Sequence, residues 1–98
     1  MTAPRQRPMA HAGSRPVMPP HVRMHFDPRR GAWAVLSPEK VLWPDEISLA
    51  ILRRCDGGAE AGAIADALAL EYGADAQEVR TDVLAFLQDW SDRMVVRL

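Results

Sequence analysis

The fold is decided by residues 32–55, AWAVLSPEKVLWPDEISLAILRRC, where the hydrophobic pattern changes its period within a short stretch. Up to Trp43 the apolar side chains follow the two-residue repeat of a β-strand, and from Pro44 onward they follow the repeat of an amphipathic helix. The pattern predicts strands over residues 32–37 and 40–43, joined by a tight reversal at Pro38 and Glu39, and then a helix.

The residues before this stretch add a first strand. Val22, Met24 and Phe26 alternate with polar side chains, which is typical of a half-buried strand. Residues 28–31, PRRG, follow with turn chemistry, because proline presets its backbone angle and glycine relaxes the exit. Strands joined by such short links are expected to form an antiparallel meander.

Three helices are predicted after the strands. Asp45 is the expected N-cap of the first, which Gly57 and Gly58 end. The second covers residues 60–72, and the third opens at Asp75. The expected apolar stripes are Ile47, Ile51, Leu52 and Cys55 in the first helix, Ala61, Ile64, Ala65, Leu68 and Tyr72 in the second, and Val79, Val83, Phe86, Leu87 and Trp90 in the third. The fold class is therefore α+β, a three-stranded antiparallel sheet followed by a three-helix bundle, with the element order of a winged helix-turn-helix.

The N-terminus differs in composition from the rest of the 98-residue chain. Residues 1–20 hold five prolines and no hydrophobic periodicity, which predicts a flexible Pro/Arg-rich tail ahead of one domain over residues 21–98. Residues 1–30 carry a net charge of +5, whereas residues 31–98 carry −6. With no signal peptide and no apolar run of about 18 residues, the sequence predicts a cytoplasmic protein with no membrane partner.

The sequence has few residues of the types that commonly form metal sites or act as nucleophiles. His11, His21 and His25 have no further metal ligand at suitable spacing, so no metal site is predicted. Cys55 lies on the first helix stripe and is expected in the core rather than as a nucleophile. We therefore expect neither a catalytic site nor a cofactor.

Two features could carry a binding function. The third strand is an expected sheet edge, since no later segment is predicted to cover it, and a free edge can pair with another chain. The third helix beside a small sheet resembles a DNA-reading arrangement, but Arg80 and Arg93 stand there among acidic residues, which fits DNA poorly. A DNA-binding winged helix and a purely structural or oligomerisation module remain as alternatives.

Several segments resemble the PqqD family of pyrroloquinoline quinone (PQQ) biosynthesis, over roughly residues 22–98. They are residues 36–39 (LSPE), 51–57 (ILRRCDG), Ile64 with Leu68, and Val79, Asp82, Val83, Phe86 and Leu87. The chain departs from the family pattern at Pro44 and Asp45, where a Leu-Asn pair is expected, and at Glu60 and Ala63 around the start of the second helix.

The resemblance implies a peptide chaperone that binds the ribosomally made PQQ precursor peptide by strand addition and presents it to a radical S-adenosylmethionine (SAM) enzyme. It implies a pairing edge at the third strand and a wall on the third helix. The expected peptide-binding residues are Lys40, Val41, Leu42 and Trp43 on the edge and Arg80, Val83, Leu84 and Leu87 on the wall. No nucleic acid is expected as a partner, and the free edge also permits a homodimer.

Overall fold

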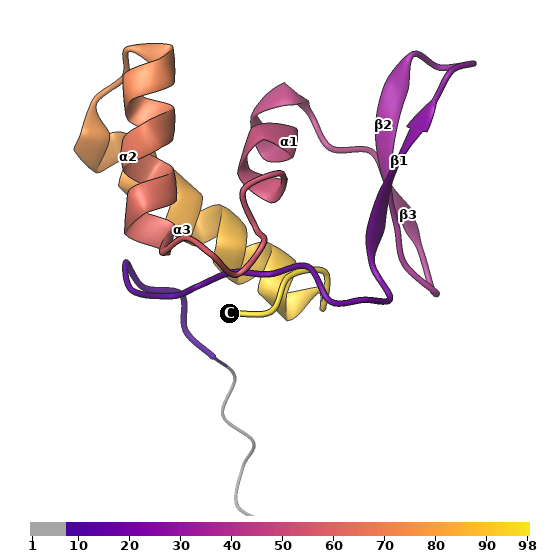
Figure 1. Ribbon diagram of the computed structural model, residues 1–98, viewed down its shortest axis with the longest axis horizontal. Helices are drawn as coiled ribbons and strands as arrows, with labels where there is room; N and C mark the ends of the chain where they lie inside the picture. Colours follow the sequence, from indigo (N-terminus) through magenta and orange to yellow (C-terminus); the bar gives the residue numbers. More distant parts are fainter. Residues whose placement is uncertain (1–7) are drawn as a thin grey trace, which may run out of the picture.

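The computed structural model describes residues 8–98 and contains three strands followed by three helices (Figure 1). The strands β1 (Arg23–Asp27), β2 (Ala32–Leu36) and β3 (Val41–Leu42) form one antiparallel sheet in the order β1-β2-β3. The helices are α1 (Glu46–Leu52), α2 (Ala61–Tyr72) and α3 (Ala76–Asp92). The predicted α+β fold class and the meander are confirmed.

Each face of the sheet follows from its register. Met24 pairs with Val35, and Val35 pairs with Leu42, so these three side chains share the inner face. Val35 is completely buried in the core, and Met24 and Leu42 pack against the core. The opposite, outer face carries the alternate residues, among them His25 and Ala34, which also pair.

Side-chain capping begins two of the three helices. The Asp45 carboxylate accepts the backbone N–H of Ser48 at 2.8 Å, and Asp75 accepts that of Glu78 at 3.0 Å. The bond from Ser48 also lowers the pKa of Asp45, because it stabilises the ionised carboxylate. Both predicted N-caps are therefore confirmed.

The N-terminal segment (residues 8–20) supplies the missing cap of α2. The side chain of Glu60 makes no capping bond. Instead, the backbone N–H groups of Ala61 and Gly62 donate to the carbonyls of Ser14 and Ala12, at 2.7 and 2.8 Å. Backbone oxygens thus satisfy two of the donors that a helix start leaves free.

Further along, the same segment is bonded to both the α1–α2 connection and the C-terminus. Val17 and Arg97 exchange two backbone hydrogen bonds of 2.9 and 2.7 Å, and the N–H of Gly57 donates to the carbonyl of Pro16 at 2.9 Å. Side-chain bonds reach it too, since Gln88 of α3 accepts from the Ala10 N–H and donates to the Pro8 carbonyl. In Figure 1 this indigo segment runs beneath the helices to reach β1.

The prediction of a flexible tail therefore differs from the structure for residues 8–20, and residues 1–7 of that predicted tail lie outside the described residues. The reason is that the segment is held by main-chain bonds to partners far away in the sequence. Such bonds need no hydrophobic periodicity, so composition does not indicate them.

Two predicted core positions are also wrong. Ile47 is 60% exposed and Tyr72 is among the exposed large side chains, although both fall on expected apolar stripes. Ile47 lies in the first turn of α1, and Tyr72 is the last residue of α2. The remaining stripe residues of α1 and α2, including Ile51, Leu52 and Leu68, are buried.

Candidate functional site

The outer edge of β3 is free among residues 8–98, since β3 pairs there with β2 alone. The Ser37 N–H donates to the Lys40 carbonyl at 3.0 Å, which makes that pair hydrogen-bonded. Antiparallel pairs alternate, so Leu42 directs its N–H and C=O toward β2. Val41 and Trp43 consequently direct theirs outward, where a further strand would pair.

The side chains along this edge are unusually apolar for an exposed strand. Val41 is 52% exposed and Trp43 is 43% exposed, while Leu42 points inward and is half-buried. Natural edges are commonly protected by charge or proline, and here Lys40 and Pro44 bracket only these three residues. The edge predicted from sequence is thus exposed and contains two large apolar side chains.

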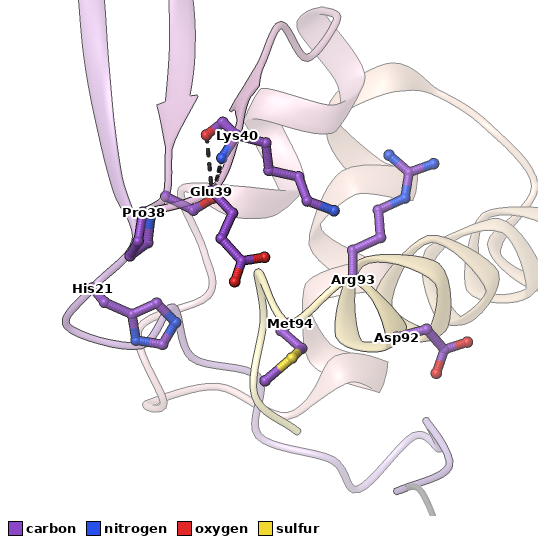
Figure 2. Close-up of a pocket in the computed structure, with 8 residues that line it drawn as sticks. His21, Pro38, Glu39, Lys40, Asp92, Arg93 and Met94 are labelled. Carbon is purple, nitrogen blue, oxygen red and sulfur yellow. Dashed lines mark hydrogen bonds between the residues drawn. The ribbon is translucent and has the colours of Figure 1, made fainter.

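A first hollow, of about 260 Å³, joins one end of this edge to the end of α3 (Figure 2). Lys40 from the β2–β3 turn and Arg93 from the end of α3 extend along the same side of it. Glu39 and Asp92 add negative charge to its wall, so the hollow is polar and of mixed charge. Its lining residues are His21, Ser37, Pro38, Glu39, Lys40, Asp92, Arg93 and Met94.

A second hollow, of about 250 Å³, lies where α1, α2 and the first half of α3 meet. Its wall is mostly apolar, with Asp82 as its one charged residue. It is lined by Ile47, Ile51, Leu68, Tyr72, Ala74, Val79, Asp82 and Val83. It therefore offers room for an apolar side chain from a bound segment.

Both hollows touch the same side of α3. Asp82 lines one and Arg93 the other, and these positions are eleven residues apart, which is about three helical turns or roughly 16 Å. Phe86 and Asp89 fall on the same side by their spacing. We call these four residues the α3 flank, and roughly five residues of extended peptide would span its length.

Three of the four predicted wall residues lie away from the α3 flank, and the fourth, Val83, lines the second hollow beside Asp82. Val83 and Leu87 are 1% and 0% exposed, so both belong to the core. Arg80 forms an ion pair with Asp66 of α2 at 3.4 Å. Leu84 lies four residues from both Arg80 and Gln88, on the side that faces α2 and the N-terminal segment.

The structure therefore brings Lys40, Val41, Leu42 and Trp43 together at one edge but does not bring the four predicted wall residues beside them. The α3 flank is a further candidate surface that the sequence analysis does not include, because its two aspartates are typical of a solvated helix face. The signal that could have found it is the i, i+4, i+7 and i+11 spacing of Asp82, Phe86, Asp89 and Arg93.

Cys55 is buried in the core, as predicted. Its thiol donates to the carbonyl of Ile51 at 3.3 Å. Burial, with a smaller contribution from the charge of Asp56, raises the pKa of the thiol to about 12. The thiolate is the nucleophilic form, so this position is unsuited to nucleophilic chemistry.

We expect Cys55 to resist thiol reagents in the folded chain. With a pKa of about 12 in place of the ordinary 9.0, its thiolate fraction at pH 8 is about a thousandfold lower than in the unfolded chain. Reaction with Ellman's reagent should be at least about a hundredfold slower in buffer than in 8 M urea. Because the folded pKa is raised, the domain should also lose stability as the pH rises above 9. Equal rates in buffer and urea would contradict the buried placement.

The described residues contain no group of three or more His, Cys, Asp or Glu side chains that could hold a metal ion. No helix in that part of the chain is long and apolar enough to cross a membrane. On the exposed sides of α3, Glu78, Asp82 and Asp89 outnumber the basic residues. This negative surface repels a phosphate backbone, so the geometry does not favour the DNA-binding alternative.

Comparison with known proteins gives a consistent result. Residues 32–96 match the family described as Coenzyme PQQ synthesis protein D (PqqD). A PqqA binding protein of Rhodopseudomonas palustris strain TIE-1 is 52% identical over 80 residues, which cover 82% of this chain and 78% of that protein. One from Bradyrhizobium diazoefficiens is 42% identical over 93 residues, covering 95% and 89%.

Two solved structures share the fold. The solution structure of the PqqD truncation of Methylobacterium extorquens PqqCD, described as a functional and stand-alone RiPP (ribosomally synthesized and post-translationally modified peptide) recognition element, superposes with a TM-score of 0.77 at 28% identity. That match covers 91% of this chain and 95% of the other. The crystal structure of PqqD from Xanthomonas campestris matches with a TM-score of 0.58 at 33% identity, with all of both chains covered.

Proposed function

Because this chain belongs to the PqqD family, we propose that it binds a PqqA-type precursor peptide as an added strand on the free edge of β3. The observation that carries the proposal is the outward direction of the N–H and C=O groups of Val41 and Trp43, which have no strand partner among the described residues. Main-chain bonds to such an edge supply affinity, and pockets for alternate side chains supply specificity.

The surroundings of the edge support this role. Alternate side chains of an added strand would point toward the inner face, on the side where the first hollow joins Lys40 to Arg93 at the end of the α3 flank. The apolar hollow can take an apolar side chain, and the mixed-charge hollow beside Lys40 and Arg93 can take a polar one. The proposed site therefore consists of Lys40, Val41, Leu42 and Trp43 with the α3 flank, and Val83 and Leu87 support that flank from the core.

The proposal extends to the step after binding. The relatives are named for binding PqqA, and the M. extorquens domain is described as a recognition element. A domain of this kind recognises the peptide and leaves the chemistry to a separate enzyme. We place this chain as the chaperone that presents the precursor to the radical SAM enzyme of the PQQ pathway.

A titration tests the binding step. Isotopically labelled full-length chain is titrated with the PqqA peptide of the same organism, while backbone amide shifts are recorded. We expect the largest shifts at positions 41–43 and on the α3 flank, and small shifts at the far side of α3 near Arg80. Size-exclusion chromatography in parallel shows whether the free chain is a homodimer that the peptide separates. No shifts at positions 41–43 under saturating peptide would refute the proposal.

A further inference from the structure

Arg30 forms a pair on the outer face of the sheet with Trp43, which belongs to the proposed peptide site. Trp43 follows β3, and the two-residue alternation places its side chain on the outer face with Val41. The guanidinium carbon of Arg30 lies 4.5 Å from the centre of the Trp43 ring. That distance is within the range of a cation–π contact, which holds the guanidinium over the ring.

The turn that carries Arg30 is itself held in place. One carboxylate oxygen of Asp27 accepts the backbone N–H of Arg29 at 2.9 Å and that of Arg30 at 3.4 Å. Gly31 closes the turn with a φ of 61°, a left-handed conformation that suits glycine. The backbone below the Arg30 side chain is therefore ordered before any peptide arrives.

The guanidinium of Arg30 makes no ion pair within residues 8–98, whereas Arg15, Arg54, Arg80 and Arg93 each make one. The Asp27 carboxylate of the same turn accepts the backbone N–H groups of Arg29 and Arg30. Arg30 thus carries a positioned charge whose hydrogen-bond donors remain available for an acceptor from outside the described chain.

Resting on the proposed function, we propose that Arg30 and Trp43 form a subsite that selects a carboxylate side chain on the bound peptide. A strand paired with Trp43 places its opposite residue on the same, outer face, with Cβ atoms about 4.5–5.5 Å apart. An Asp or Glu at that place reaches the guanidinium that stacks on the ring. Arginine can bind a carboxylate through its N–H groups and an aromatic ring through its plane at the same time.

The subsite adds a selection for acidic peptide residues that the inner face does not supply. The inner-facing residues of the peptide meet the α3 flank, which carries Asp82 and Asp89 and disfavours acidic side chains. The outer-facing residue opposite Trp43 meets Arg30 instead, which lies over the Trp43 ring. The preferred guest is therefore an extended segment whose outer-facing positions include an acidic residue.

The test compares two arginines of the same turn. Affinity for synthetic PqqA peptide is measured by calorimetry for wild type, Arg30→Gln, Arg30→Lys and Arg29→Gln. Arg29 has the same charge and is exposed, but makes no contact with an aromatic ring among the described residues, so it controls for net charge. We expect Arg30→Gln to weaken binding by about three- to tenfold and Arg29→Gln by less than about twofold. Arg30→Lys should recover only part of the loss, because lysine lacks the planar fork.

Peptides in which each Asp and Glu is changed singly to its amide complete the test. One of them should bind wild type about three- to tenfold more weakly and bind Arg30→Gln no more weakly than the unchanged peptide does, as a coupled pair requires. If wild type binds but Arg30→Gln and Arg29→Gln behave alike, the subsite is refuted while the peptide-binding function stands. If wild type itself fails to bind, the proposed function is refuted.

Discussion

Affinity for the PqqA peptide is expected to fall by at least about tenfold when Val41 is changed to proline. Val41 directs its N–H to the open side of β3, so proline removes a donor that the added strand needs and sets its ring in that strand's path. The bond between the Ser37 N–H and the Lys40 carbonyl, which closes the β2–β3 turn, does not involve the Val41 N–H. Calorimetric titration of the variant with the peptide measures the loss.

Two further variants test whether loss of the outward N–H causes the weaker binding. Val41→Ala keeps the N–H and should lose only the contribution of the exposed side chain, a change of less than about threefold. Leu42→Pro removes an N–H that is directed to β2, so it should disturb the sheet itself and alter the circular dichroism spectrum. If Val41→Pro keeps its folded spectrum and binds as wild type does, strand addition at this edge is wrong.

Changing Leu87 to alanine should destabilise the domain by about 2–5 kcal/mol, a large part of the stability that a domain of this size has. Leu87 is completely buried in the core cluster with Val35 and Ile64. Its removal therefore leaves a cavity as well as losing hydrophobic transfer energy. Urea unfolding followed by tryptophan fluorescence measures the change.

Leu70 provides the matched control for this variant, because the same substitution there removes a side chain that is 87% exposed. Leu70→Ala should change the free energy of unfolding by less than about 0.5 kcal/mol. The comparison also clarifies the role of Leu87 in binding, since any weaker binding by Leu87→Ala should disappear at temperatures where the variant is fully folded. A Leu87→Ala variant that stays folded but no longer binds the peptide would show that Leu87 is part of the peptide-binding wall.

The strands, the helices and two of their caps could be predicted because each depends on residues close together in the sequence, although α1 ends at Leu52 and not at the predicted Gly57 and Gly58. The alternation around Phe26 and Val35 and the aspartates at 45 and 75 act locally, and the structure has them as expected. The same holds for the free edge, which required only that no later segment form a strand. Sequence patterns were sufficient where the interaction joins residues that are close together in the chain, as in strand alternation and side-chain capping.

The helix wall could not be predicted in the same way. Val83 and Leu87 were expected in the peptide-binding wall, but a domain this small needs both for its own core, so they face inward. Which side of a helix remains free depends on where α2 and the N-terminal segment pack, and those contacts join residues as far apart as Ala10 and Gln88. Periodicity identifies the face that is buried but not the elements that bury it.

The way the N-terminal segment caps α2 has a practical consequence for how this domain can be shortened or joined to other proteins. A chain trimmed to begin at residue 21, where the first strand is foreseen, would lose the carbonyls of Ala12 and Ser14 and leave two amides at the start of α2 without acceptors. A tag or an enzyme fused ahead of residue 8 would instead extend from the domain at a point beside Gln88. This point lies on the side of α3 away from the α3 flank. Such fusions should leave the route to β3 open.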